Sequence, residues 1–321
     1  MRLILLPLSL TNSLKTAADS AILKVLNHGG ARTPRPSGEV TAVRTMTLDG
    51  FDEIADRWSP ILKYAGFRID LRTVFCHSRP QVTFTPVPHP NYSGGTKPRR
   101  CELADLLIVI DHVDPSRRIN DRQAVLVQAK ILEGRAVKPS GSEWVQHELL
   151  AWLPAFSFLD PGYDSRSRDL KGGHKVGSPI QSAEYGGINL NTSPPIWRHE
   201  LTSITAPWFT SPIPLADFLA RMATGQTDCG RLAVRGGSDD WSFTVDELLR
   251  VTAAHPIVQT NASVLRGNNN VVGFIADTSP WSSGGGGGWS EYIDGDVPDW
   301  PEGPISTIHM HISSIDDRSY E

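Results

Sequence analysis

Cysteine is scarce in this chain of 321 residues, which has only Cys76, Cys101 and Cys229 and no C-x-x-C pair. An odd, unpatterned set of this kind argues against a disulfide framework and against a thiolate zinc site. No apolar run approaches the roughly 18 residues that a membrane-spanning helix needs. The stretch MRLILLPLSL has one base before its apolar part and no clear small-residue cleavage site after it, which disfavours a signal peptide. We therefore expect a cytoplasmic localisation, free thiols and no membrane partner.

A large excess of one charge is also absent, because the formal net charge is only −4. The charge is nevertheless unevenly spread: residues 276–321 contain nine acids and one base, so this tail carries −8 and the rest of the chain +4. An asymmetry of this kind concerns partners or masking rather than fold. We interpret the acidic tail as a solubilising end, with docking over a basic face or onto a basic partner as the alternative.

Hydrophobic periodicity predicts a mixture of helices and strands. Helical spacing is present at 10–26 and 51–65, each followed by glycine, and again at 140–153, 214–225 and 243–255. Alternating or continuous apolar runs predict strands at 67–75, 81–84, 103–110, 124–132, 268–277 and 306–315. The expected class is α/β or mixed α+β, with a central mixed sheet flanked by helices.

Two of the predicted strands carry polar residues where a buried strand would not need them. In CELADLLIVI (101–110) Asp105 stands at the start of the apolar run, and in AVLVQAKIL (124–132) Gln128 and Lys130 lie in the middle. If the two strands are antiparallel neighbours, Gln128 and Lys130 share one face, and an acid on the adjacent strand offsets the cost of burying the ammonium. Carboxylate and amide oxygens also suit Mg²⁺. The plain alternative is a buried Asp105–Lys130 ion pair with Gln128 as a core amide.

The arrangement of Asp105 followed by Gln128-Ala129-Lys130 on a second strand resembles the PD-(D/E)xK nuclease superfamily, most closely its Q-x-K branch of Mrr-like endonucleases. The likeness spans roughly residues 45–155. It departs from the pattern in having Ala104 where the motif has proline, and in the neutral Gln128 in place of an acid. It implies a restriction-endonuclease-like core and a weak or one-metal site.

The resemblance also implies a role for each site residue. Asp105 would be the principal ligand of Mg²⁺ or Mn²⁺, Gln128 and the Ala129 carbonyl would complete the metal shell, and Lys130 would be the catalytic lysine. The helix glutamate that the superfamily often adds would be Glu53, with Asp52 next to it, and Glu102 could serve as an extra ligand.

Basic residues gather around these motifs. Between residues 97 and 138 there are nine bases and six acids. Those expected to contact the phosphates of a nucleic acid are Arg99, Arg100, Arg117, Arg118, Arg122, Arg135 and Lys138. Arg117, Arg118 and Arg122 fall in DHVDPSRRINDRQ (111–123), which we expect to form a hairpin loop.

The function expected on these grounds is a metal-dependent endonuclease, acting on double-stranded DNA, as the effector of a bacterial restriction or anti-phage defence system with a possible regulatory protein partner. The competing expectation is a nuclease fold without activity that serves as a nucleic-acid-binding or protein-interaction module.

The segments expected are a nuclease-like core with N-terminal helices at 1–155, a recognition extension at 156–275, and the acidic glycine-rich tail with its terminal strand at 276–321. In that strand His309 and His311 share a face and form a possible metal pair. Without a third ligand in reach, we interpret them as a solvated strand face.

Overall fold

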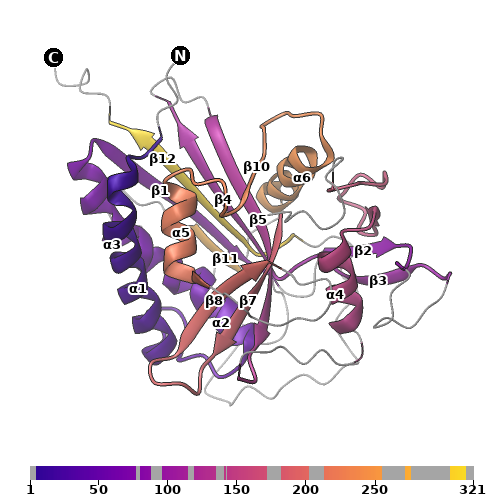
Figure 1. Cartoon of the computed structure of the whole chain (residues 1–321), viewed down its shortest axis with the longest axis horizontal. Helices are drawn as coiled ribbons and strands as arrows, with labels where there is room; N and C mark the ends of the chain where they lie inside the picture. The colour runs from indigo at the N-terminus through magenta and orange to yellow at the C-terminus, as the bar shows by residue number, and fades with distance from the viewer. Residues whose placement is uncertain are drawn as a thin grey trace.

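A mixed β-sheet forms the centre of the molecule in the computed structural model (Figure 1). The structure describes residues 5–76, 80–87, 96–114, 119–134, 141, 143–171, 182–201, 213–254, 272–275 and 304–315. Across the sheet the strands follow the order β11 (Val272–Ile275), β1 (Phe67–Phe75), β12 (Thr307–Ser314), β4 (Leu106–Val113), β5 (Ile119–Ile131), β7 (Ala183–Asn189), β8 (Ile196–Leu201) and β9 (Ile213–Pro214), and β10 (Arg231–Leu232) pairs with the first half of β5. The mixed α/β class expected from the sequence is confirmed.

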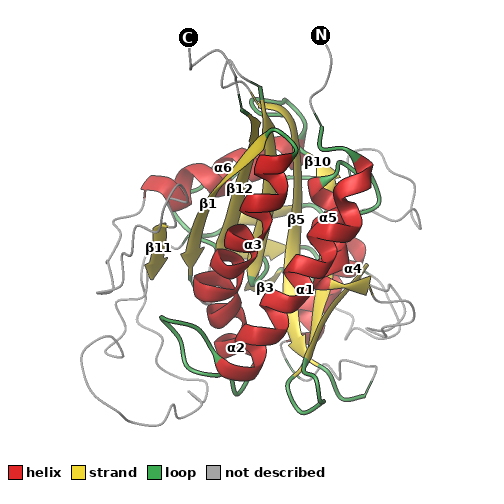
Figure 2. Cartoon of the chain, turned by 90° about the vertical axis from the view of Figure 1, so that its left-hand side faces the viewer, coloured by secondary structure: helices red, strands yellow, loops and turns green. Residues whose placement is uncertain are grey.

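Helices cover both faces of this sheet. One face packs against η1 (Leu8–Leu10), α1 (Thr11–His28), α2 (Glu39–Thr45), η2 (Met46–Gly50), α3 (Phe51–Tyr64) and α5 (Leu215–Ala223), most of which stand in front of the strands in Figure 2. The other face packs against α4 (Glu143–Trp152), α6 (Asp240–Ala254) and a small antiparallel sheet of β3 (Arg99–Glu102), β2 (Gln81–Phe84) and β6 (Phe156–Phe158). The two layers explain why β4 and β5 are apolar on both sides.

The helical patterns of the N-terminal region fold as expected. In α1 the buried residues recur every three or four positions, and the helix ends at Gly29, whose φ of 76° suits a residue without a side chain. The indole of Trp58 in α3 is fully buried, and its Nε1 donates a hydrogen bond of 2.8 Å to the Leu14 carbonyl of α1. Pro60 is accommodated inside α3.

The strands β4 and β5 extend into the segment that we expected to be a hairpin loop. β4 continues to Val113 and β5 already begins at Ile119, and the two strands are antiparallel with Asp111 opposite Arg122. The loop expectation for 111–123 is therefore wrong for most of its length, because Asp111 and Arg122 satisfy each other's charge within the sheet.

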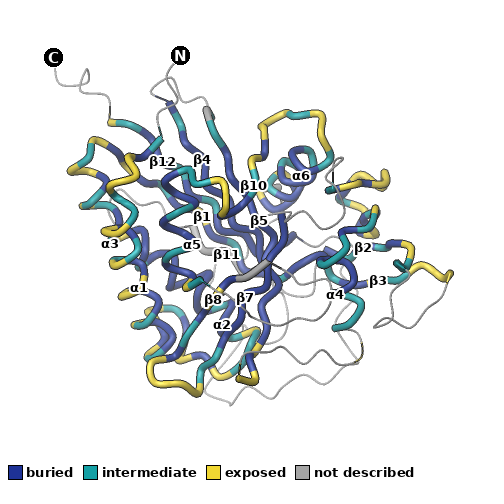
Figure 3. Tube along the Cα trace, viewed as in Figure 1, coloured by how far each residue is buried: buried dark blue, intermediate teal, exposed yellow. Residues whose placement is uncertain are grey.

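Strands from all three predicted segments join the same sheet. β12, from the acidic tail, lies between β1 and β4, and β7 and β8 extend the sheet beyond β5. Figure 3 shows the central strands of this sheet mostly in the colour of buried residues. The remaining parts of the acidic tail, residues 276–303 and 316–321, lie outside the described residues. In the described part of the chain, none of the helices has both the length and the apolar character that a membrane span requires.

Candidate active site

Asp105 lies at the mouth of the β4–β5 ladder. Its backbone N–H donates to the Val127 carbonyl at 3.1 Å, and beyond this point β5 continues without β4 beside it. The freed space is taken by the Asp105 carboxylate, whose Oδ2 accepts a hydrogen bond of 2.7 Å from the Ala129 N–H and another from Gln128 Nε2. Asp105, Gln128 and Ala129 are thus brought together, as the antiparallel arrangement expected from the sequence requires.

Lys130 is held between the first residues of two helices. Its Nζ lies 2.8 Å from Glu39 Oε1 of α2 and 3.5 Å from a carboxylate oxygen of Glu143 of α4. The side chain of Lys130 is only 9% exposed, whereas Glu39 and Glu143 are partly open to solvent. Neither glutamate was identified from the sequence: Glu39 follows the loop-like stretch TPRPSG, and Glu143 is distant from Lys130 in any reading of strand periodicity.

The acids of this cluster compete for one ammonium group. Burial, assisted by the charge of Asp105, raises the pKa of Glu39 to about 7 against the opposing effect of Lys130. Burial likewise raises the pKa of Asp105 to about 6, although Lys130 and the hydrogen bonds from Ala129 and Gln128 oppose it. For Lys130, burial acts to lower the pKa, but the charges of Asp105 and Glu39 outweigh it and the pKa is raised. Lys130 is therefore protonated at neutral pH.

The residues present fit a hard divalent cation such as Mg²⁺. Gln128 is fully buried, and among the described residues its Oε1 has no hydrogen-bond partner, although an unpaired buried amide oxygen is costly. The Ala129 carbonyl points to the same side of β5 as the N–H that Asp105 binds, beyond the last ladder pair. Three carboxylates around one ammonium also leave negative charge to be balanced. A small cavity reaches Asp105 and is lined by Glu39, Val40, Val43, Phe75 and Cys76.

The other acids named from the sequence lie elsewhere. The carboxylate of Glu53 is bound by Lys24 Nζ at 2.8 Å and by Arg57 at 2.9 Å, on the outer side of α1 and α3, so it does not join the cluster. The helix glutamate beside Lys130 is Glu39 instead. Asp52 pairs with Arg32 at 3.2 Å. Glu102 ends β3 in the small sheet, opposite Gln81 of β2.

Two of the bases expected to reach phosphates are engaged within the protein. Arg122 is buried and donates from Nε to Asp111 Oδ1 at 2.6 Å, and its Nη1 contacts Asp246 of α6 at 2.5 Å, so its guanidinium is not placed for the phosphate contact expected of it. Arg99 pairs with the fully buried Glu148 at 2.8 Å. Arg100 is exposed on β3. The remaining four, which lie outside the described residues, are Arg117, Arg118, Arg135 and Lys138.

A second group of chemically capable side chains lies at the far end of β4. Asp111 Oδ2 is 2.8 Å from His309 Nε2 and 3.5 Å from His311 Nδ1. The view that the two histidines have no third ligand in reach is therefore wrong, because the parallel pairing of β12 with β4 places Asp111 in register with His311. Burial and the neighbouring His309 lower the pKa of His311 to about 4.

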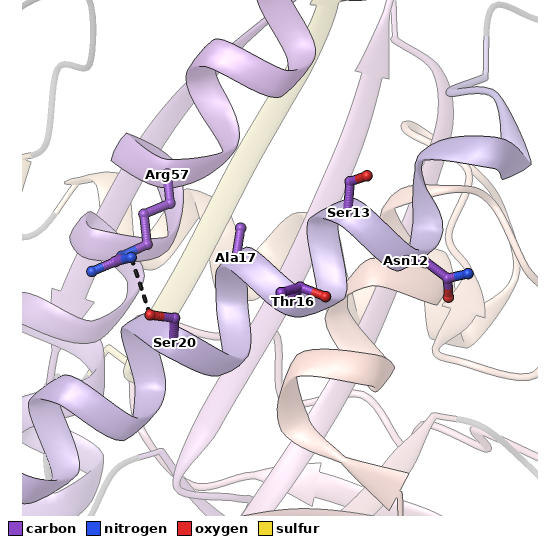
Figure 4. A pocket seen from close by; sticks show the side chains of 6 residues that line it. All are labelled: Asn12, Ser13, Thr16, Ala17, Ser20 and Arg57. Atoms are coloured by element: carbon purple, nitrogen blue, oxygen red, sulfur yellow. Dashed lines mark hydrogen bonds between the residues drawn. The ribbon is translucent and has the colours of Figure 1, made fainter.

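A shallow hollow on the outer side of α1 has no comparable chemistry. It is lined by Asn12, Ser13, Thr16, Ala17, Ser20 and Arg57, and Figure 4 shows the Arg57 guanidinium turned toward the Ser20 hydroxyl, with a hydrogen bond of 3.1 Å. These groups include neither a carboxylate nor an imidazole, so the cluster around Lys130 remains the better candidate.

No family model, curated protein or solved structure matches this chain, so its function has to be inferred from the geometry of these groups.

Proposed function

We propose that the chain is a metal-dependent phosphodiesterase of the PD-(D/E)xK type, an endonuclease that acts on double-stranded DNA. The observation that carries the proposal is the meeting of Asp105, Gln128 and Lys130 at the open end of the β4–β5 ladder, with the Gln128 Oε1 buried and without a hydrogen-bond partner in the described part of the chain. A core ion pair alone would need neither this orphaned oxygen nor the two further acids around Lys130.

The metal would be held by oxygen atoms of adjacent residues. Asp105 supplies a carboxylate, Gln128 its amide oxygen and Ala129 its backbone carbonyl, a set that suits Mg²⁺ or Mn²⁺. When bound, such an ion polarises a phosphoryl oxygen and lowers the pKa of a coordinated water. The two hydrogen bonds that Asp105 accepts fix its orientation before any ion arrives.

Lys130 and Glu39 have different roles in the proposed reaction, one stabilising negative charge and the other accepting a proton. Because the raised pKa keeps Lys130 protonated, it supplies positive charge and hydrogen-bond donors to the phosphate as negative charge develops there, and it is not the base. Glu39, with its pKa raised to about 7, can accept a proton from the attacking water near neutral pH. In the proposed reaction the oxygen of water forms a new P–O bond and Glu39 takes the proton of the water. The bond to the leaving oxygen breaks, and that oxygen keeps the electron pair and takes a proton from solvent.

The test compares nicking of supercoiled plasmid in Mg²⁺ and in Mn²⁺ by the wild-type protein and four variants. We expect Asp105→Asn and Lys130→Met to lose at least about 100-fold in rate, and Glu39→Gln to lose about 10²–10⁴-fold, as removal of a general base does. Glu53→Gln is the matched control: it removes a glutamate from a neighbouring helix, away from the cluster, and should keep full activity. Thermal melts establish that each variant is folded.

Equal activity in wild type and Asp105→Asn would identify a contaminant and overturn the assignment. If wild type cuts neither DNA nor RNA, Mn²⁺ binding followed by electron paramagnetic resonance decides between the remaining readings. Binding that is lost in Asp105→Asn would leave a metal-binding nuclease fold without cleavage. Absence of binding would overturn the proposal.

A module without activity is the second candidate, and one observation favours it. Lys130 is already engaged by Glu39 and Glu143, so its ammonium has to be shared or released before it can contact a phosphate. In that case the fold would bind nucleic acid or a protein partner, and cleavage would be absent at every metal concentration. The role in a restriction or anti-phage system rests on the family resemblance alone and is part of the proposal.

A further inference from the structure

The end of the sheet opposite Asp105 presents two imidazoles and one carboxylate on the same face. His309 and His311 alternate with the apolar Met310 on β12, and Asp111 lies next to His311 in the parallel β4. Asp111 in β4 is six positions after Asp105, which at roughly 3.3 Å per residue is about 20 Å. The two groups are therefore separate places on the molecule.

Both imidazoles turn toward a single carboxylate oxygen. Asp111 Oδ2 is 2.8 Å from His309 Nε2 and 3.5 Å from His311 Nδ1, the two rings have centroids 4.0 Å apart, and the three ligand atoms lie within 4.8 Å of one another. Zinc binds such atoms at about 2.0–2.2 Å, so a tetrahedral shell would set them about 3.4 Å apart. The two separations of 2.8 and 3.5 Å, with all three atoms within 4.8 Å of one another, lie within about 1.5 Å of that spacing.

The carboxylate is held in place from behind. Asp111 is fully buried, and Arg122 donates to it from Nε at 2.6 Å to Oδ1 and from Nη2 at 3.1 Å to Oδ2. Arg122 is itself anchored to Asp246 of α6. Partners that orient a ligand in this way are a regular part of metal sites. The histidines keep some contact with solvent, 14% and 27% of their side-chain surface, so an ion can reach them.

We propose that Asp111, His309 and His311 form a binding site for a divalent transition metal of the zinc class, distinct from the oxygen-lined cluster around Asp105. Two imidazole nitrogens and one carboxylate oxygen suit Zn²⁺ or Co²⁺ better than Mg²⁺, which prefers oxygen ligands alone. Three protein ligands leave a fourth position for water. The ion joins β12 to β4, two strands that lie almost 200 residues apart in sequence.

The proposal is tested on the full chain after treatment with a chelator, by titration with Zn²⁺ in a calorimeter and with Co²⁺ in a spectrophotometer. We expect one equivalent of Zn²⁺, visible Co²⁺ absorption of tetrahedral type, and a higher melting temperature with Zn²⁺. His309→Asn and His311→Asn should each weaken Zn²⁺ binding at least tenfold and abolish the Co²⁺ band. His28→Asn, which removes an exposed histidine at the end of α1, should leave both unchanged.

A double variant of His309 and His311 that still binds one Zn²⁺ with unchanged affinity would overturn the site, as would a wild-type protein that binds none. Asp105→Asn separates this inference from the proposed nuclease activity. It should remove the response to Mg²⁺ or Mn²⁺ and keep the Zn²⁺ and Co²⁺ signals, so that either site can fail without the other.

Discussion

Glu39 and Glu53 each lie in the first turn of a helix, yet their surroundings shift their pKa values in opposite directions. Burial and the charge of Asp105 raise the pKa of Glu39 to about 7. At Glu53 burial also acts to raise the pKa, but hydrogen bonds from Lys24 and Arg57 outweigh it and the pKa is lowered. The difference between a candidate base and a surface ion-pair partner thus comes from neighbours rather than from residue type or position in a helix.

The thiols give a prediction at the same scale. All three cysteines are buried thiols, and burial is the main cause that raises the pKa of Cys229 to about 12. With that pKa only about one molecule in 10⁴ carries the thiolate at pH 8. We expect iodoacetamide to label the peptide containing Cys229 very slowly in the native protein and rapidly in guanidinium, as followed by mass spectrometry. Native labelling at the rate of a free thiol would contradict this burial.

At the scale of elements, Arg122 connects β4, β5 and α6. Its guanidinium forms ion pairs with Asp111 on β4 and Asp246 on α6, and the Asp111 carboxylate is not exposed to solvent. The hydrogen bonds from His309 and Arg122 outweigh the effect of burial, so the pKa of Asp111 is lowered and the group stays ionised. Removing one partner of a buried pair leaves the other charge uncompensated, which is the costly case.

We therefore predict that Arg122→Ala lowers the free energy of unfolding by about 3–5 kcal/mol. Asp246→Asn should cost only about 0.5–1 kcal/mol, because Asp246 is partly exposed and Arg122 keeps its contact with Asp111. Urea denaturation measures both. A loss of similar size in the two variants would show that the contact with α6, rather than the buried pair, carries the stability.

The hydrophobic pattern of the sequence was sufficient to locate most helices and strands. It was not sufficient to predict contacts between segments that are distant in sequence. The spacing of Leu14, Ala18 and Ile22, or the run in β4, reflects burial along one element, which the sequence records directly. The approach of Asp105 to Gln128 follows from pairing two neighbouring strands. Other contacts join segments too far apart for any periodicity to connect, as with Glu39 and Lys130, or Asp111 and the two histidines of β12.

At the scale of the whole molecule, β12 determines whether the sheet is continuous. It is antiparallel to β1 and parallel to β4, and its inward residues Ile308, Met310 and Ile312 are fully buried. Without it both neighbours would present an open edge in the middle of the core, and open edges lead to association.

We predict that a chain ending at residue 303 does not reach the native state. It should elute as aggregate in gel filtration and lack near-ultraviolet circular dichroism, whereas Met310→Ala, which keeps the strand, should fold with a loss of about 2–5 kcal/mol. A synthetic peptide of residues 304–315 added during refolding should restore part of the signal. A shortened chain that is monomeric and native-like would contradict the central place of β12.

The position of β12 near the end of the sequence also determines when the central sheet can be completed during synthesis. Its partner β1 begins at Phe67 and β12 begins at Thr307, so β1 is translated 240 residues before β12. Because translation adds roughly 5–20 residues per second, β1 and β4 are present for tens of seconds without the strand that pairs with both of them. Chaperones have that interval in which to act, and the group of Asp111, His309 and His311 is complete only after the ribosome has passed β12.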